Sequence, residues 1–178
     1  MNKIVFIFLL LISMQHTKHI IVDFSLKSKT SSWKVVDDVV MGGVSKGNFK
    51  INKNGNGFYF GQVSLENNGG FSSLRYRFEE INCTKFSKVI LRIKGDGKNY
   101  QFRIKNKYSN YYSYISTFST SGNWESIEIN LKEMYPAFRG RKLDMANFSS
   151  ETIEEIAILI GNKKPQNFQL EIDKIYLE

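Results

Sequence analysis

The sequence predicts a single all-β domain of jelly-roll sandwich architecture. Gly is plentiful at 13 residues, Pro is scarce at 2, and aromatic residues make up 14% of the 178-residue chain. Short segments of β-branched and aromatic residues recur between Gly- and Asn-rich turns, whereas segments of helical period are nearly absent. Many short strands with this punctuation are typical of a two-sheet sandwich. No Pro- or Ser-rich linker and no internal repeat divides the chain, so we expect one domain over residues 20–178.

The first half of this domain is predicted to form four strands. The segment Asn54–Gly57 has the sequence Asn-Gly-Asn-Gly, which strongly favours a hairpin because Gly and Asn accept the positive φ angles of tight turns. The predicted strands are Ile20–Leu26, Asn48–Ile51, Gly57–Leu65 and Phe71–Phe78.

The second half contains the clearest strand pattern, because residues 100–105 alternate between apolar and polar side chains. This period of two places one face of the strand in a core and the other in water. Apolar residues change parity between 168–172 and 175–177, which predicts a β-bulge near Asp173. A short helical turn is expected at Ser149–Glu155, with Ser150 as its N-cap. The predicted strands are Lys88–Lys94, Tyr100–Lys105, Tyr111–Phe118, Trp124–Leu131, Ile156–Ile160 and a last strand from Phe168 to Leu177.

The N-terminus has the pattern of a signal peptide. Lys3 precedes nine consecutive apolar residues, Ile4–Ile12, and a bilayer span would need about 20. We expect residues 1–19 to be a signal peptide or an N-terminal hydrophobic leader. A cleaved leader predicts export to the periplasm or the extracellular space, and a retained leader predicts membrane association. The segment lacks the Arg-rich amphipathic character of a mitochondrial transit peptide.

Charge, histidine and cysteine usage exclude several function classes. The net charge of +8 comes from cations interspersed with acids and not from a basic tail, so no nucleic-acid partner is predicted. Both histidines, His16 and His19, fall in the expected N-terminal tail, which leaves no imidazole for a catalytic triad or a zinc site. Cys83 is the single cysteine and is expected to be a buried hydrophobe. No acidic pair has the spacing of a glycosidase. The sequence predicts no catalytic residue, metal or cofactor.

Four sequence motifs stand out along the chain. They are W-x-x-V-x-D-x-V-M-G-G-V-S at Trp33–Ser45, V-S-L-E-N-N-G-G-F at Val63–Phe71, L-R-I-K-G-D-G at Leu91–Gly97 and F-R-G-R at Phe138–Arg141. Together they resemble the complex I intermediate-associated protein 30 family in content, order and spacing, and the resemblance covers residues 23–178. It implies a galactose-binding-like jelly-roll β-sandwich without catalytic residues.

The resemblance also implies kinship with a chaperone-like assembly factor for complex I, the NADH:ubiquinone oxidoreductase. The predicted function is therefore a non-catalytic binding module that acts through protein–protein interaction. Its expected partner is a protein, for example a membrane-associated respiratory complex. The alternative is an exported carbohydrate-binding module, which the implied fold, the leader and the Asn- and aromatic-rich loops favour.

Candidate binding residues are polar or aromatic groups on the motif loops and on the polar side of strands. Asn amides suit sugars but also cap turns, and Arg guanidinium groups suit carboxylates, phosphates or sugars but also form ordinary surface ion pairs. An indole would be a sugar platform only if exposed. The candidates are Asp37, Glu66, Asn67, Asn68, Arg75, Arg103, Trp124, Arg139 and Arg141.

Two features of the motif loops have structural explanations beside functional ones. The pairs Gly42-Gly43 and Gly69-Gly70 are either turns that require positive φ or close backbone approach, or parts of a ligand-contacting loop. Glu66, Asp37 and Asp38 offer hard oxygen ligands, but without a D-x-D-x-D pattern no calcium site is predicted.

Overall fold

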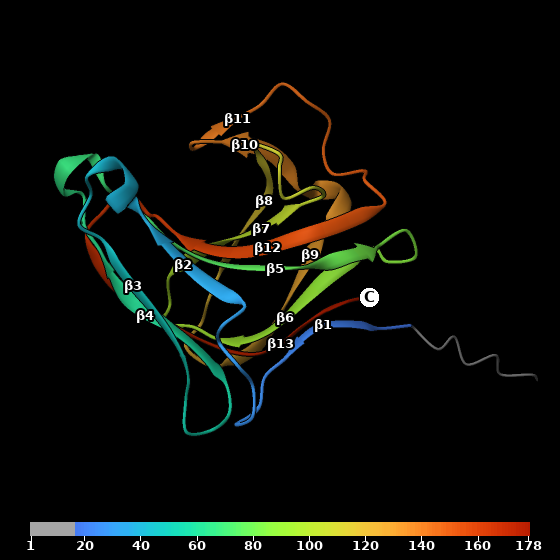
Figure 1. Cartoon of the computed structure of the whole chain (residues 1–178), viewed down its shortest axis with the longest axis horizontal. Coiled ribbons are helices and arrows are strands. Elements are labelled where there is room, and N and C mark those ends of the chain that lie inside the picture. The colour runs from blue at the N-terminus through green and yellow to red at the C-terminus, as the bar shows by residue number, and fades with distance from the viewer. Residues whose placement is uncertain (1–16) are drawn as a thin grey trace, which may run out of the picture.

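Two antiparallel sheets pack face to face in the computed structural model, which describes residues 17–178 (Figure 1). This confirms the predicted jelly-roll sandwich. Residues 1–16, which hold most of the expected leader, lie outside the described part. The seven-stranded sheet has the order β11 (Arg141–Lys142), β10 (Tyr135–Phe138), β8 (Ser113–Ser119), β7 (Asn99–Lys105), β12 (Thr152–Ile160), β5 (Ser72–Asn82) and β2 (Trp33–Asp37).

The second sheet has six strands, and short 3-10 turns connect several elements. Its order is β3 (Lys46–Ile51), β4 (Gly57–Val63), β13 (Gln166–Leu177), β6 (Lys88–Lys94) and β9 (Trp124–Asn130), with β1 (His19–Asp23) paired to β13. The 3-10 turns are η1 (Asp38–Met41), η2 (Glu66–Asn68) and η3 (Leu131–Glu133).

The alternating segments form the centre of the core, as predicted. On β6 the side chains of Val89, Leu91 and Ile93 are fully buried, and on β7 the residues Tyr100 and Phe102 are buried in the same way. The predicted bulge in the last strand is confirmed, because the register of β13 against β6 shifts between residues 172 and 174. That shift lets both ends of β13 direct apolar side chains inward.

The helical turn expected at Ser149–Glu155 is wrong, because β12 begins at Thr152. The register of β12 against β5 shifts between Ile153 and Glu155, so Ile153 and Ile156 both face the core. Their three-residue spacing resembles that of a helix although the backbone is extended. The shift also explains why the apolar pattern of the sequence predicts only the later part of this strand, Ile156–Ile160.

Three further segments differ from expectation. The sequence places residues 33–37 and 136–141 in the motif loops, but β2, β10 and β11 are short strands at or near the edges of the seven-stranded sheet. The sequence also places His19 in the tail, but His19 is the first residue of β1, so the described domain does contain one imidazole. In residues 17–178 the chain forms 13 strands, more than the nine or ten that turn spacing predicts.

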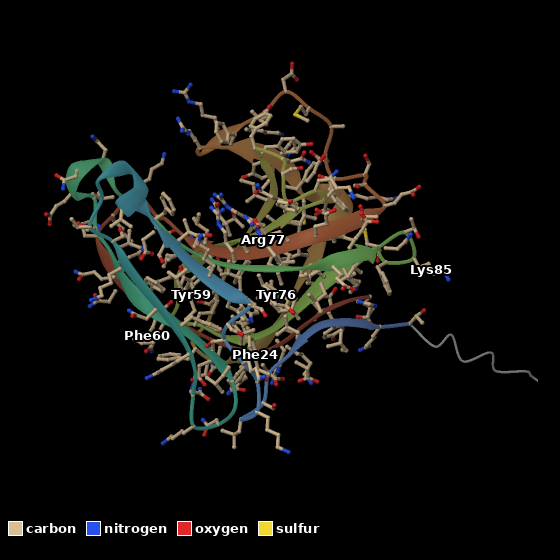
Figure 2. All side chains as sticks on the ribbon, in the orientation of Figure 1. Phe24, Tyr59, Phe60, Tyr76, Arg77 and Lys85 are labelled. Carbon is tan, nitrogen blue, oxygen red and sulfur yellow. The ribbon has the colours of Figure 1, made fainter. Side chains whose placement is uncertain are left out.

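An aromatic cluster closes the core at the β2 end of the sandwich. Trp33 stacks on Tyr76 with ring centroids 4.7 Å apart and lies 5.1 Å from Phe49. Phe24 joins the same cluster, with its ring centroid 5.5 Å from that of Trp33. Figure 2 shows Tyr76 and Tyr59 between the two sheets. Trp33 is thus a core residue, and its burial stabilises the fold through both apolar area and ring contacts.

A buried carboxylate joins the first two motif loops. Asp38 is only 1% exposed, and its side chain accepts hydrogen bonds from the Ser45 backbone N–H and hydroxyl, at 3.0 and 2.5 Å. It also accepts from the backbone N–H groups of Gly70 and Phe71, at 2.5 and 3.1 Å. The Ser45 hydroxyl oxygen in turn accepts from the Ser64 N–H at 3.0 Å. Four donors around one buried carboxylate satisfy it fully.

The neighbouring carboxylate of Asp37 links the two sheets. It accepts hydrogen bonds from the Gly47 N–H on β3 at 3.0 Å and from the Ser72 hydroxyl on β5 at 2.5 Å. The Ser72 hydroxyl itself accepts from the Tyr59 hydroxyl on β4 at 2.7 Å. These hydrogen bonds therefore link β2 and β5 of the seven-stranded sheet to β3 and β4 of the six-stranded sheet at the edge of the core.

One member of each glycine pair has a structural explanation in Asp38. A Cβ atom on Gly43 would lie 2.2 Å from Oδ1 of Asp38, and a Cβ atom on Gly69 would lie 2.6 Å from Oδ2. Any side chain at either position would push the carboxylate away from its donors. Gly42 adds a conformational requirement, since its φ angle is +86°.

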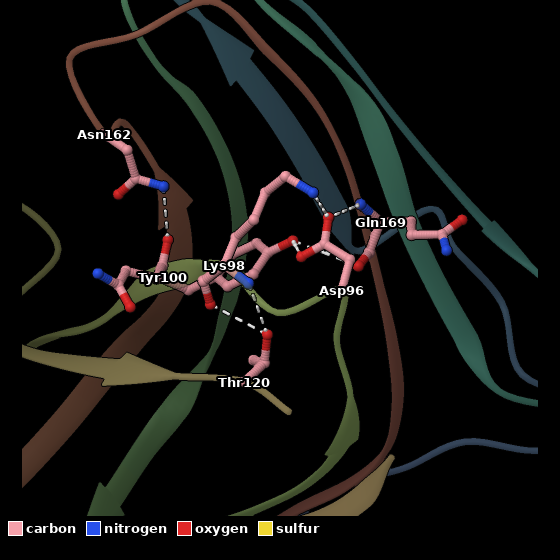
Figure 3. A network of polar contacts seen from close by, with 7 residues as sticks. Asp96, Lys98, Tyr100, Thr120, Asn162 and Gln169 are labelled. Atoms are coloured by element: carbon pink, nitrogen blue, oxygen red, sulfur yellow. Dashed lines mark hydrogen bonds and ion pairs between the residues drawn. The ribbon is translucent and has the colours of Figure 1, made fainter. Parts of the chain in front are cut away.

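A second polar network holds the turn between β6 and β7, where the chain crosses from one sheet to the other. The Asp96 carboxylate accepts hydrogen bonds from Lys98 Nζ at 2.7 Å, the Tyr100 hydroxyl at 3.0 Å and the Gln169 N–H at 2.9 Å (Figure 3). The Thr120 hydroxyl bridges both backbone groups of Lys98. Asp96, which the sequence places in an ordinary turn, therefore anchors this crossover.

We predict that Asp38→Asn lowers the free energy of unfolding by about 3 kcal/mol, because an amide cannot accept all four hydrogen bonds and leaves buried donors unpaired. Denaturant titration would measure this loss. Asp144→Asn is the matched control, since Asp144 is exposed and forms no ion pair or side-chain hydrogen bond with residues 17–178. Equal midpoints for the two variants would contradict the assigned role of Asp38.

The advantage of wild type over Asp38→Asn should depend on pH. Burial acts to raise the pKa of Asp38, but the hydrogen bonds from Ser45, Gly70 and Phe71 outweigh it and lower the pKa below 3.8. A lowered folded-state pKa stabilises the fold above the unfolded-state pKa, and this stabilisation is lost as the pH falls through the folded-state pKa. Unfolding measured at several pH values should show the difference shrinking below about pH 4. A difference that stays constant down to pH 2 would refute it.

We also predict that Gly43→Ala destabilises the domain more than Gly97→Ala. The first substitution places a methyl group against the Asp38 carboxylate, whereas a Cβ on Gly97 meets nothing within 4 Å and is strained only by its φ of +77°. The expected losses are about 3 and about 1 kcal/mol. Thermal or denaturant unfolding of both variants would show whether this order is reversed.

Candidate functional site

The seven-stranded sheet presents one face to the core and one face away from it. On β12, Ile156 and Ile158 belong to the core, so the alternate residues Glu155, Ala157 and Leu159 point to the other side. Cross-strand register extends this set across the sheet. We call it the outer face, and it consists of Lys34, Val36, Ser73, Arg75, Arg77, Gln101, Arg103, Lys105, Ser113, Ile115, Thr117, Tyr135, Ala137, Glu155, Ala157 and Leu159.

The seven-stranded sheet is curved, and the outer face is its concave face. In Figure 1 the sheet bends so that β10 and β11 stand at one side of it and the η1 and η2 turns stand at the other. Figure 2 shows Arg77 on this side of β5 and β12. A rigid sheet fixes the spacing of the side chains that it presents, which suits a binding surface.

The outer face is strongly basic. On β2, β5 and β7 its five cations are Lys34, Arg75, Arg77, Arg103 and Lys105, and the carboxylate among the residues named above is Glu155. Lys142 on β11 pairs with Ala137 and adds a further cation at the edge. The Glu155 carboxylate, only 3% exposed, accepts a hydrogen bond from Nε of Arg77 at 2.6 Å. Within residues 17–178, no ion pair is formed by Lys34, Arg75 or Arg103.

Arg103 is held in place and partly desolvated. It donates from Nε and Nη2 to Oε1 of Gln101, at 3.1 and 2.6 Å. Burial, followed by the charge of Arg75, lowers the pKa of Arg103 to about 10. The two arginines therefore repel each other in a half-buried setting where no carboxylate neutralises them.

Lys105 extends the same basic region. Its ammonium group donates to the backbone carbonyls of Tyr108 and Asn110. Burial lowers the pKa of Lys105, Glu155 opposes that change, and the charges of Arg75 and Arg77 lower the pKa further. The charges of the outer face thus contribute to the pKa shifts of two of its own groups, Arg103 and Lys105.

The apolar residues of the outer face lie beneath its polar ones. Ile115, Ala157 and Leu159 are 4%, 5% and 7% exposed. The groups left at the surface are guanidinium, ammonium, amide and hydroxyl groups. This face therefore offers hydrogen bonds and charge, and no exposed apolar anchor at its centre.

Aromatic residues gather at the β10–β11 edge of the outer face. Phe138 is 37% exposed and packs edge-to-face against Tyr111, which is 63% exposed, with ring centroids 5.1 Å apart. The guanidinium group of Arg139 lies 5.2 Å from the Phe138 ring. Arg139 and Gly140 both have positive φ angles, as the two-residue turn between β10 and β11 requires. Arg141 follows on β11 and is exposed.

The predicted site residues do not form one cluster. Arg75 and Arg103 meet on the outer face, and Arg139 and Arg141 lie at its β10–β11 edge. Glu66, Asn67 and Asn68 are exposed in η2, where both asparagines have positive φ. Asp37 is engaged in the link between the sheets. Trp124, 36% exposed, lies on β9 of the other sheet beside Arg92.

Sequence reasoning missed four members of the outer face that complete its polar surface: Lys34, Arg77, Gln101 and Lys105. The signal for Gln101 and Lys105 was available, since they share the polar side of residues 100–105 with Arg103. The positions of Lys34 and Arg77 depend on strand pairing, which one sequence does not reveal.

Other candidate chemistries find little support in residues 17–178. No three His, Cys, Asp or Glu side chains converge there as a metal site would require. Cys83 is 3% exposed, and burial raises the pKa of its thiol. No helix in this part of the chain is long and apolar enough to cross a membrane.

A surface depression of about 500 Å³ lies away from the outer face. It is lined by residues 28–31 and by Phe49, Lys50 and Ile51 of β3. None of the predicted site residues lines it. Its lining offers two lysines and three hydroxyl groups without a buried charge or an organised donor set, so the outer face is the stronger candidate.

The fold is similar to that of carbohydrate-binding modules. A family 11 carbohydrate-binding module from Clostridium thermocellum, solved with a β-1,3-1,4-mixed-linked tetrasaccharide, matches with a TM-score of 0.68 and 17% identity over 90% of this chain and 94% of that chain. The family 11 module of the cellulosomal cellulase Lic26A-Cel5E from the same organism matches with a TM-score of 0.68 and 16% identity, with the same coverage of both chains.

One domain of a larger enzyme has a related fold. An exo-β-agarase matches with a TM-score of 0.56 and 11% identity, over 90% of this chain but only 25% of the enzyme. At these identities the structural matches establish the jelly-roll fold alone. The family model for complex I intermediate-associated protein 30 matches residues 22–172, nearly the whole described domain. The chain therefore belongs to the complex I intermediate-associated protein 30 (CIA30) family.

Proposed function

We propose that this chain is a non-catalytic binding module that takes its ligand on the outer face of the seven-stranded sheet. The observation that carries the proposal is the concentration of five cations and one carboxylate on β2, β5, β7 and β12 of this face, above a floor of buried apolar residues. Four of those cations, all except Arg77, form no ion pair among residues 17–178. Cations without partners on a rigid surface are suited to an external ligand.

The chemistry of the outer face favours a saccharide ligand. Stable protein interfaces concentrate their energy in apolar or aromatic anchors near the centre. Here the central apolar side chains Ile115, Ala157 and Leu159 are covered. The groups that remain, such as the amide of Gln101 and the hydroxyl of Thr117, match the hydroxyl groups of a sugar. The similarity in fold to carbohydrate-binding modules supports this candidate, and an exported protein would meet polysaccharides.

A protein partner is the second candidate, and the family description favours it. Membership of a family named for a complex I intermediate supports an assembly role through protein–protein contact. A basic face complements an acidic protein surface and accelerates encounter. The exposed aromatic pair Tyr111 and Phe138 at the β10–β11 edge would supply the anchor that the centre lacks.

Affinity electrophoresis of the full chain in gels that contain neutral or acidic polysaccharides tests the saccharide proposal. We expect retardation by at least one polysaccharide, and we expect Gln101→Ala to weaken it about fivefold, as the loss of one hydrogen bond would. Gln169→Ala is the matched control, because its side chain is exposed on β13 of the other sheet. Unretarded migration in every gel would overturn the saccharide proposal.

Affinity purification from membrane fractions, with the tagged chain as bait, tests the protein candidate. A reproducible partner whose recovery falls when Phe138 is replaced by Ala would support it. Cell fractionation would add an independent criterion, because an assembly factor for complex I must reach the compartment in which that complex is built. Absence of any reproducible partner, together with polysaccharide binding, would leave the saccharide proposal as the function.

A further inference from the structure

We propose that Arg75 and Arg103 form a carboxylate-binding subsite over Ala157, and that the ligand of the outer face is an acidic polysaccharide of the uronate type. This inference rests on the proposed saccharide function and specifies its ligand. It is carried by the placement of two arginines without carboxylate partners on the strands that flank β12.

The register of the sheet places the two arginines on opposite sides of one small residue. Ala157 pairs with Arg75 on β5 and with Arg103 on β7. Adjacent strands lie about 4.8 Å apart, so the two arginine backbones are about 10 Å apart with only a methyl group between them. Ala157 is itself covered, at 5% exposed, so the arginine side chains, and not the alanine, present the surface here. A carboxylate bound above Ala157 would lie between two guanidinium groups.

The donors of Arg103 are aimed and available. Oε1 of Gln101 accepts from Nε and Nη2, which fixes the plane of the guanidinium group. Its Nη1 group has no hydrogen-bond partner among residues 17–178, and Arg75 donates no hydrogen bond there at all. A planar carboxylate matches the fork geometry of a guanidinium group and accepts two parallel hydrogen bonds from it.

Electrostatics supply the driving force. The charge of Arg75 contributes to the lowered pKa of Arg103, so each guanidinium group destabilises the charge on the other. An anion between them removes this repulsion and replaces it with two attractions in a partly desolvated site. Glu155 does not fill this role, because it is committed to Arg77.

The row of residues that pair across the sheet through Ala157 favours a polymer with repeated carboxylates. Lys34 pairs with Arg75 on the far side from Ala157, so three unpaired cations lie in one line across β2, β5 and β7. A polyuronate presents a carboxylate on each residue and sugar hydroxyls between them. An acidic peptide also carries carboxylates. The apolar side chains by which protein partners are usually anchored would find no exposed apolar residue at the centre of the outer face.

The test compares polygalacturonate with a neutral mixed-linked β-glucan, heparin and poly-glutamate, using the full chain and affinity electrophoresis or calorimetry. We expect polygalacturonate to bind most tightly. Arg75→Gln and Arg103→Gln should each weaken it about 10-fold or more, as removal of a charged hydrogen bond does. Arg92→Gln, on the outer side of the other sheet beside Trp124, is the matched control and should change binding by less than about twofold.

Each outcome decides a different point. No binding to any polysaccharide would overturn both this subsite and the saccharide function, whereas binding of the neutral glucan alone would overturn the subsite and leave the function standing. Preference for heparin, which carries sulfates beside its uronate carboxylates, would assign the site to a sulfated saccharide. Preference for poly-glutamate would transfer the site to a protein partner. Either result overturns the proposal. Arg75→Lys is a second variant for the case in which the Gln variants unfold. A folded Lys variant keeps the positive charge but should lose severalfold affinity, because an ammonium group cannot make the bidentate contact. Unchanged affinity would contradict that contact.

Discussion

The buried carboxylate of Asp38 is the interaction on which this end of the sandwich depends. It receives four hydrogen bonds from three backbone N–H groups and one hydroxyl group, supplied by the segment before β3 and by the segment before β5. A buried charge of this kind is tolerated only when its acceptors are saturated. The requirement extends to Gly43 and Gly69, since any Cβ there would displace the carboxylate. One side chain thus explains one glycine of each pair and joins two distant loops.

This arrangement assigns the first two family motifs to the fold and leaves the proposed outer-face contacts to other positions. The motifs at Trp33–Ser45 and Val63–Phe71 converge on Asp38 and on the core contact of Trp33, and they maintain the fold. Such motifs report how the chain folds and not which ligand it takes. In the binding proposed above, ligand choice depends on positions outside these two motifs, above all Arg75 and Arg103 on the outer face. Neither arginine takes part in the Asp38 network, so these positions can differ without change to the two loops that Asp38 joins.

The sequence predicts the centre of the fold better than its edges, for a physical reason. The strands β6 and β7 alternate regularly because each has one face in the core, so their bounds are visible from period alone. The start of β12 is obscured by a register shift, and the β10–β11 hairpin is short and lies at an edge. For the site, residue type and strand parity nominate Arg103. Its proximity to Arg75 depends on β12 lying between β5 and β7, which is a pairing of distant segments.

The central apolar side chains of the outer face are buried, and this bears on whether a saccharide or a protein can bind there. Both candidate partners would meet the same basic face, and long-range attraction alone does not distinguish an acidic polysaccharide from an acidic protein. The central apolar residues are covered, so desolvation of apolar area contributes little there and hydrogen bonds must supply the specificity. Exposed apolar area is found instead at Tyr111 and Phe138 on the β10–β11 edge. A ligand that binds only the centre must therefore rely on hydrogen bonds and charge, as the proposed saccharide would, and a protein partner anchored by apolar contacts must also cover the edge.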